Sequence, residues 1–397
     1  MHMPRSSVRY LIGAAWARTG EEMSGPALLL LGLSATGSIS TGSTLWAALT
    51  ATSALGGPLV GLALDRSARP ARLLAWLLAL YAFGLVALTL VLGSALPLGW
   101  AVATALVLGV LGPVLSGGWT AQLPALVRSD RLEHITTWDA MTFGAAALIG
   151  PALAAAVAAG AGPWVAVWAS AGALVLAAAL ARSLPVVGHV KEQGRVGAQL
   201  LAGAAVCLRS PPLLRATAVT SLSLAGTGMV VVCVPMLGER FLGAAAHGAW
   251  LLSVMAVCSL LANLVLSRRT CAPSPGALIL VCVLAQAAGT ALVAVAPSWV
   301  GMAVAALVLG AAEGPQLTAL FSVRHRHAPG HLRAQVFTVG ASLKISAFAL
   351  GAAVAGPLVE RSVMLCLAVA AGVHLLAALT HGVLSLRRPG SGAVTGV

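Results

Sequence analysis

Three charged residues stand close together in the first long apolar segment of the chain: Arg18, Glu21 and Glu22. If this segment is a helix, Arg18 lies one turn from either glutamate, and its guanidinium can reach one or the other. The two carboxylates point about 100° apart, so one arginine is a poor partner for both at once. We therefore predict that Glu21 or Glu22 takes up and releases a proton. A structural ion pair with Arg18 that locks the helix is the alternative.

Three more charged residues lie in apolar segments. Glu313 directly precedes Gly314-Pro315, and Asp139 and Lys344 each precede a later Gly-Pro pair by about three helical turns. A charge in the hydrocarbon region costs at least ~2.5 kcal/mol, so each of them needs a partner or a function. Asp139 and Lys344 could pair with each other, or either could pair with a charge of the first segment. For Asp139, a capping or solvated carboxylate near the inner membrane surface is an equal alternative.

The composition defines the elements that position these charges. Of 397 residues, 59% are hydrophobic and only 8% are charged, against about 25% charged in an ordinary soluble domain. Soluble, disordered and disulfide-stapled classes are therefore excluded, and the long Ala/Leu-rich runs exclude a membrane β-barrel. The sequence predicts an all-α polytopic membrane protein with twelve transmembrane helices at about 9–34, 43–64, 73–95, 98–120, 138–160, 163–183, 212–238, 246–267, 275–297, 299–321, 334–357 and 362–385.

The net charge of +13 is explained by where the basic residues stand. With both termini inside, nineteen of the 23 Lys and Arg fall at inner loops or termini and two at outer loops, as the positive-inside rule requires. No nucleic-acid reading motif accompanies them, and no signal peptide is recognisable at the N-terminus. We predict a multi-pass protein of the cell inner (cytoplasmic) membrane with both termini in the cytoplasm, and no nucleic-acid partner.

The chain contains a weak internal repeat. Leu108-Gly109 recurs as Leu309-Gly310, Gly112-Pro113 as Gly314-Pro315, and Gly150-Pro151 as Gly356-Pro357, at offsets of 201 to 206 residues. The repeat predicts two pseudo-symmetric six-helix halves, 1–183 and 212–397, with the site between them near the midplane. The polar stretch 184–211 is the cytoplasmic linker. Part of it, Gln193–Leu208, is predicted to be an amphipathic helix on the membrane surface; a solvated linker is the alternative.

The segment after the second predicted helix carries a motif. It reads Gly61-Leu-Ala-Leu-Asp65-Arg66-Ser-Ala-Arg69 and resembles the loop 2–3 signature of the major facilitator superfamily. In that family the Asp caps the cytoplasmic start of helix 11, and the Arg residues pair with neighbouring acids and hold the inner gate shut. The resemblance implies these roles for Asp65, Arg66 and Arg69. A carboxylate is favourable at a helix N-terminus, and Gly61 permits close helix packing.

Two further stretches are similar to a particular branch of this superfamily. Leu208-Arg209-Ser-Pro-Pro-Leu-Leu-Arg215 resembles the linker entering helix 7 in macrolide-efflux proteins and siderophore exporters, and Gly144 with Gly150-Pro151 resembles the helix 5 signature of exporters. This resemblance implies export. We expect the two Gly-Pro pairs, Gly150-Pro151 and Gly356-Pro357, to bend their helices.

Neither a metal site nor a cofactor is predicted. His325, His327 and His331 lie close together, but they alternate with arginines and have no acid or cysteine nearby, so a positive loop touching lipid phosphates is the favoured reading and a metal site the alternative. The six cysteines form no CxxC pair. No P-loop is present for ATP hydrolysis.

These observations together predict a secondary active transporter, not an enzyme. It would be a proton-coupled exporter (an antiporter of the drug-export kind) of lipophilic or amphiphilic small molecules, working by alternating access. Its partners would be the substrate, protons and membrane lipid, and it would be monomeric. The alternatives are an importer of a small nutrient, a membrane-embedded enzyme and an uncoupled lipid flippase.

Overall fold

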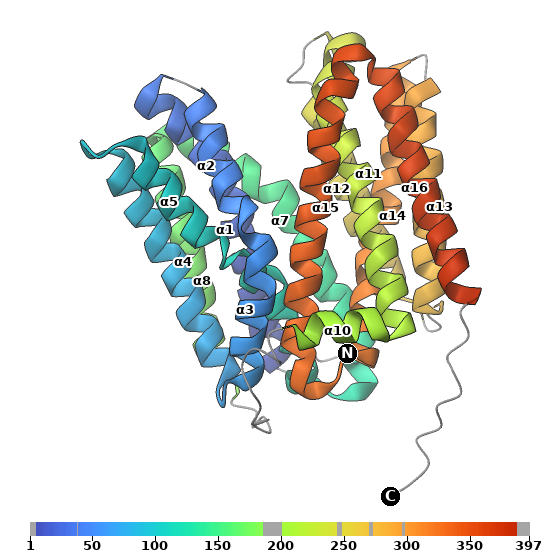
Figure 1. Ribbon diagram of the computed structural model, residues 1–397, viewed down its shortest axis with the longest axis horizontal. Helices are drawn as coiled ribbons and strands as arrows, with labels where there is room; N and C mark the ends of the chain where they lie inside the picture. Colours follow the sequence, from blue (N-terminus) through green and yellow to red (C-terminus); the bar gives the residue numbers. More distant parts are fainter. Residues whose placement is uncertain are drawn as a thin grey trace, which may run out of the picture.

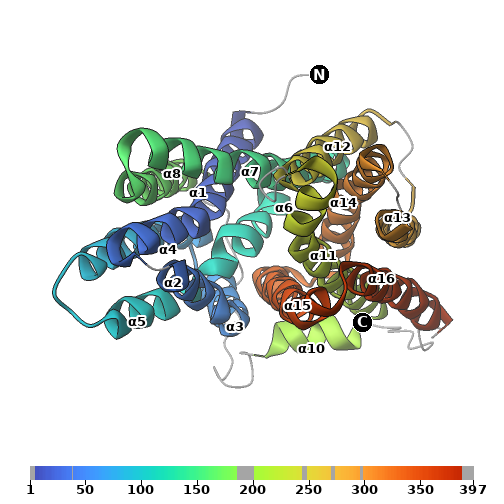
Figure 2. The ribbon, with the colours of Figure 1, turned by 90° about the horizontal axis from the view of Figure 1, so that it is seen from above.

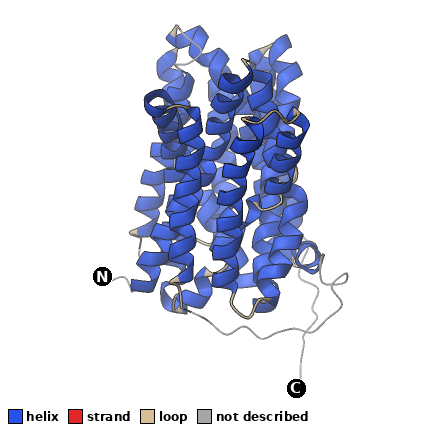
Figure 3. Ribbon diagram, turned by 90° about the vertical axis from the view of Figure 1, so that its left-hand side faces the viewer, coloured by secondary structure: helices blue, strands red, loops and turns tan. Residues whose placement is uncertain are grey.

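The protein is built almost entirely of helices (Figures 1 and 3). The structure is a computed structural model that describes residues 5–37, 39–185, 201–243, 248–269, 273–295 and 298–386. All regular elements in these ranges are helical. In a bilayer, a helix satisfies its own backbone hydrogen bonds, which an open strand cannot do. The predicted all-α polytopic class is confirmed.

The N-terminal half comprises the helices α1 to α8, which gather on one side of the molecule in Figures 1 and 2. Two of the predicted spans are interrupted in this half, the second at Thr52 and the fourth after Gly109. The elements are α1 (Arg5–Thr36), α2 (Ile39–Ala51), α3 (Ser53–Arg66), α4 (Pro70–Leu92), α5 (Leu98–Gly109), a π-helical turn (Val114–Gly118), α6 (Leu123–Leu126), α7 (Leu132–Ala161) and α8 (Pro163–Arg182).

The C-terminal half comprises the helices α11 to α16 on the other side. Its spans are continuous, and each corresponds to one predicted segment. They are α11 (Pro211–Leu242), α12 (Ala249–Ser267), α13 (Pro275–Val295), α14 (Trp299–His327), α15 (Arg333–Arg361) and α16 (Val363–Leu386). Between the halves lies α10 (Ala202–Arg209); the remainder of the predicted linker helix falls outside the described residues.

Eleven helical segments of the described chain are long and apolar enough to cross a membrane. The first predicted span corresponds to α1, which is not among them and carries Arg18, Glu21 and Glu22 in its middle. Its neighbours compensate for its polarity, since α1 packs extensively against α7 and α8. The helix with the least apolar sequence is thus held inside its half of the bundle.

The internal repeat is visible in how corresponding helices pack. In the N-terminal half, Leu108 of α5 fills the space above Gly84 of α4, where an added Cβ would lie 3.0 Å from its Cγ. In the C-terminal half, Leu309 of α14 fills the space above Gly289 of α13, where an added Cβ would lie 2.9 Å from the leucine Cγ. Small residues let membrane helices approach closely. Equivalent leucine–glycine contacts therefore recur about half a chain apart.

The halves contact each other mainly through α3 with α15 and α7 with α12. Figure 1 shows the two groups of helices close together at the end that carries α10, and farther apart at the opposite end. Asp65, Gly61 and Gly57 of α3 lie at this contact.

Candidate functional site

The only described carboxylate paired directly with Arg18 belongs to Asp139 of α7, not to Glu21 or Glu22. Arg18 Nη2 lies 3.0 Å from Asp139 Oδ1, and the two side chains are 1% and 0% exposed. Arg18 also donates to the backbone carbonyl of Asp139 at 2.7 Å. The sequence left two possible partners for Asp139, Lys344 or a charge of the first segment. The structure pairs it with Arg18 of the first segment. The alternative of a solvated carboxylate is wrong, because the contact with α1 buries it completely.

The Asp139 carboxylate has two more partners. Tyr10 Oη donates to Oδ1 at 2.9 Å, and Thr120 Oγ1 donates to Oδ2 at 3.0 Å. Arg18 in turn donates to the hydroxyls of Thr120, at 2.9 Å, and Thr142. A buried ion pair is stable only when such hydrogen bonds replace the lost water. This hydrogen-bonded cluster connects α1 to α7 and to the segment after the π-helical turn.

An aromatic chain leads from this cluster into the other half. The guanidinium of Arg18 lies 3.6 Å from the ring centroid of Phe143, a cation–π distance. The centroids of Phe143 and Phe321 are 5.5 Å apart, and those of Phe321 and Phe337 are 5.8 Å apart. Phe143 belongs to α7, and the other two rings belong to α14 and α15. The halves therefore meet through packed rings next to the ion pair.

Glu21 and Glu22 are left without a direct cation partner within the described residues. Glu21 is half-buried and Glu22 is exposed. The carboxylate of Glu22 interacts repulsively with that of Glu313 on α14, across the halves. Glu313 is attracted to Lys344 of α15, although these two do not form a direct ion pair. Electrostatic interactions thus connect Glu22 of the N-terminal half to Glu313 and Lys344 of the C-terminal half.

Asp65, in the last turn of α3, has its carboxylate against the first residues of α15. Its Oδ1 accepts a hydrogen bond from the backbone N–H of Ala334, and its Oδ2 accepts one from that of Gln335, both at 2.8 Å. The first N–H groups of a helix have no partner of their own, and a carboxylate there also complements the helix dipole. The contact joins the last turn of α3 in one half to the first turn of α15 in the other.

Glycines bring α3 and α15 together above this cap. A Cβ on Gly61 would lie 2.5 Å from Cα of Gln335, so any larger residue would push the helices apart. Next to Gly57, Thr338 Oγ1 donates to its carbonyl at 2.6 Å. One turn farther, Ser342 Oγ donates to the carbonyl of Ser53 at 2.5 Å. The halves are sealed here by backbone-level contact.

The two arginines of the motif follow Asp65 in sequence, Arg66 at the end of α3 and Arg69 just before α4. Arg69 is exposed and forms no ion pair with any described residue, and Arg66 is half-buried. Pro151 and Pro357 lie inside the long helices α7 and α15, which leaves their bending role a prediction.

The histidine group of the sequence is only partly an exposed loop, since His325 is buried whereas His327 and His331 are exposed. The helix α14 extends through His327, and Arg324 and His325 are 1% and 6% exposed within it. The His325 ring packs on Phe337 with centroids 4.7 Å apart. No group of three or more metal-ligating side chains occurs among the described residues. The expectation fails for these two residues because the helix continues one and a half turns beyond the apolar run.

The sequence did not reveal a buried polar cluster in the C-terminal half. Ser223 Oγ donates to Gln286 Oε1 at 2.5 Å, and Gln316 Nε2 donates to the same oxygen at 3.0 Å. His374 Nδ1 lies 3.3 Å from Ser223 Oγ, and its Nε2 has no partner. The four residues come from α11, α13, α14 and α16. Uncharged polar residues on separate helices give no local pattern; their occurrence inside apolar segments was the available signal.

Comparison with known families now gives the class of the protein. The family model described as Major Facilitator Superfamily matches residues 10–352. The chain therefore belongs to this superfamily and is a multi-pass membrane transporter of small molecules. No curated protein sequence matches it significantly.

Solved structures share the fold over nearly the whole chain. A bacterial homologue of the iron transporter ferroportin, in an outward-facing state, has a TM-score of 0.78 at 17% identity, covering 97% of this chain and 100% of its own. The human organic anion transporter MFSD10 (TETRAN) has a TM-score of 0.74 at 17% identity, covering 96% and 100%. The proton:xylose symporter XylE has 0.69 at 12%, covering 94% of both chains. These likenesses concern the fold, and the exporter branch stays a prediction.

Proposed function

We propose that the chain is a proton-coupled exporter of lipophilic or amphiphilic small molecules that works by alternating access. The observation that carries this proposal is that the three charges of α1 differ in whether they have a direct ion-pair partner. Arg18 is committed to Asp139, which leaves Glu21 and Glu22 without a direct cation. A carboxylate free of a permanent partner at membrane depth can change its protonation state during a transport cycle.

The proton path in this proposal runs between the halves. Glu22 and Glu313 interact across them, and Lys344 stands near Glu313. Protonation of either glutamate removes the repulsion between them and lets the halves approach. We assign coupling to Glu21, Glu22, Glu313 and Lys344. To the Arg18–Asp139 pair we assign the positioning of α1.

The inner gate in this proposal is the contact of α3 with α15. Asp65 caps α15, and Gly61 allows close packing, with Arg66 and Arg69 beside them. Opening this side requires that both backbone hydrogen bonds to Asp65 break. With this side closed, we infer an outward-facing state. The proposal further takes the chain as a monomer of two halves, 1–183 and 212–397, in the inner membrane with both termini in the cytoplasm.

Export rests on the sequence resemblance to efflux proteins, so direction is what the experiment must test. Fluorescent cationic and neutral dyes would be offered to efflux-deficient cells that carry the chain, with and without a protonophore. The Glu21→Gln/Glu22→Gln double variant would be compared at equal membrane abundance. Glu239→Gln is the matched control, because Glu239 is an exposed residue near the end of α11.

Proton-coupled export predicts lower dye accumulation in cells with the parent chain and with Glu239→Gln. The protonophore and the double variant should both return accumulation to that of cells without the chain. Concentrative export that survives the double substitution would contradict coupling through α1. Higher accumulation in cells with the parent chain would instead indicate an importer.

A further inference from the structure

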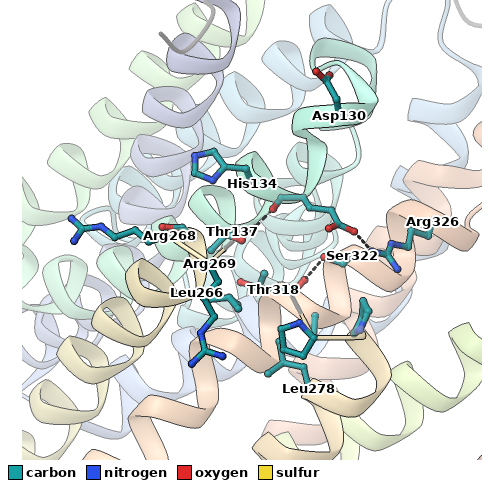
Figure 4. Close-up of a pocket in the computed structure, with 15 residues that line it drawn as sticks. Asp130, His134, Thr137, Leu266, Arg268, Arg269, Leu278, Thr318, Ser322 and Arg326 are labelled. Carbon is teal, nitrogen blue, oxygen red and sulfur yellow. Dashed lines mark hydrogen bonds and ion pairs between the residues drawn. The ribbon is translucent and has the colours of Figure 1, made fainter. Parts of the chain in front are cut away.

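A cavity of about 650 Å³ opens between the halves, where α7 and α13 begin and α12 and α14 end (Figure 4). Its walls are the first turns of α7 from the N-terminal half, and the end of α12, the start of α13 and the end of α14 from the C-terminal half. It lies away from the α3–α15 seal and shares none of the coupling residues. The transport cycle described above gives it no role.

The acids of this cavity already have cations. Glu133 of α7 forms an ion pair with Arg326 of α14, which crosses the halves. Asp130 lies 3.3 Å from Arg128 in the same loop. The charge of both carboxylates is therefore compensated locally.

Two arginines of the cavity have no such compensation. Arg268 and Arg269, just after α12, are exposed and form no ion pair with any described residue. Both line the cavity (Figure 4). Arginine guanidinium groups favour bidentate binding of phosphate. The cavity thus has two exposed arginines on its wall that form no ion pair with a described residue.

The hydroxyl groups around the cavity already donate hydrogen bonds within the protein, which leaves the arginines as the main donors to an anion. Thr137 donates to the carbonyl of Glu133 at 3.1 Å, and Ser322 donates to that of Thr318 at 3.0 Å. Thr318 itself donates to Asn263 at 3.0 Å. Since these hydrogens are used within the protein, recognition of an anion falls to the guanidinium groups.

The surface next to the arginines is apolar. Leu261 and Val265, one to two turns before Arg268 on α12, are 55% and 58% exposed, and Val281 of α13 is 62% exposed. In a membrane-spanning helix such side chains face acyl chains. A ligand that fits both surfaces has an anionic head at the membrane boundary and apolar tails.

We propose that this cavity binds the phosphate head group of an anionic phospholipid between the two halves, through Arg268 and Arg269. The acyl chains lie along Leu261 and Val265 of α12. Because the walls come from both halves, the lipid binds best when this end is closed, and it stabilises that arrangement by mass action. The proposal does not depend on cargo or proton coupling.

The test uses the full chain purified in a neutral detergent. Dioctanoyl phosphatidylglycerol, dioctanoyl phosphatidylcholine and glycerol phosphate would be titrated separately, with binding followed by native mass spectrometry and by the shift in thermal unfolding. The variant is Arg268→Gln/Arg269→Gln. The matched control is Arg182→Gln/Arg209→Gln, which removes two exposed arginines from the ends of α8 and α10.

We expect the phosphatidylglycerol to bind the parent chain and the control equally, and the Arg268→Gln/Arg269→Gln variant about tenfold more weakly. Phosphatidylcholine and glycerol phosphate should bind the parent weakly. Equal affinity for both double variants would overturn the site. Glycerol phosphate binding as tightly as the lipid would overturn the lipid assignment and indicate a soluble phosphate ligand. Failure of dye export in cells would leave either result unaffected.

Discussion

The two halves of the molecule bury polar groups in different ways. The N-terminal half holds one full ion pair, Arg18 with Asp139, and gives the carboxylate Tyr10 and Thr120 as further donors. The C-terminal half buries neutral amide, hydroxyl and imidazole groups, and it keeps Glu313 and Lys344 apart. It also buries the guanidinium of Arg324, which forms no ion pair with any described residue. A satisfied pair resists change, whereas separated charges can respond to a proton or a ligand. In the proposed cycle, the Arg18–Asp139 pair holds the fold, and Glu313 and Lys344 take part in coupling.

Breaking the N-terminal pair should have the largest effect on stability. Asp139→Asn leaves the guanidinium of Arg18 buried without a counter-charge, and we expect a loss of about 3–5 kcal/mol in the free energy of unfolding. Unfolding in detergent, followed by tryptophan fluorescence, measures it. Arg18→Met/Asp139→Leu should lose less than the single variant, because no unpaired charge remains. A double variant that loses as much would mean that the pair does not behave as a unit.

The glycines of the two Gly-Pro pairs should respond in opposite directions. A Cβ on Gly150 would lie 2.5 Å from Cβ of Glu22, whereas one on Gly356 would meet no atom within 4 Å. We expect Gly150→Ala to cost about 1–3 kcal/mol through overpacking. Gly356→Ala should stabilise its helix by up to about 1 kcal/mol. The same unfolding assay compares them. Equal changes in stability at Gly150 and Gly356 would contradict the expected difference in packing between these two positions.

The ion pair that crosses the halves should contribute least. Glu133 and Arg326 are each about half exposed, and such pairs stabilise by at most about 1 kcal/mol. A double-mutant cycle with Glu133→Gln and Arg326→Gln measures their coupling. Its value should fall further at high salt, because exposed charges are screened. Coupling as large as that of Arg18 with Asp139 would show that this surface pair also locks the halves.

Local patterns predicted the spans well. The helices α5 and α8 start at the residues predicted for their segments, and both ends of α12 lie within a few residues of the predicted ones. Interruptions were harder to predict, since the second span breaks at Thr52 and the fourth continues as a π-helical turn after Gly112-Pro113. These breaks depend on neighbouring helices that satisfy the freed backbone groups. Thr52 Oγ1, for example, donates to the carbonyl of Leu106 at 2.5 Å.

Residues with unusual character were found from the sequence, but it left several partners open for each of them. A charge in an apolar segment is conspicuous, so Arg18, Glu22 and Asp139 were all singled out. Arg18 was first considered with the glutamates one turn away, and its partner proved to be a residue 121 positions along the chain. The cluster of Ser223, Gln286 and His374 has no local pattern at all, because each residue comes from a different helix.

The sequence by itself determined that the chain is a bundle of membrane helices, that it repeats, and which charges are costly. These properties follow from composition and from periodicity within one segment, and the bilayer enforces them on each helix separately. Only the tertiary structure decided which charges are satisfied and where the halves touch. Both depend on which helix faces stand side by side, and that choice is made by packing between segments far apart in the chain.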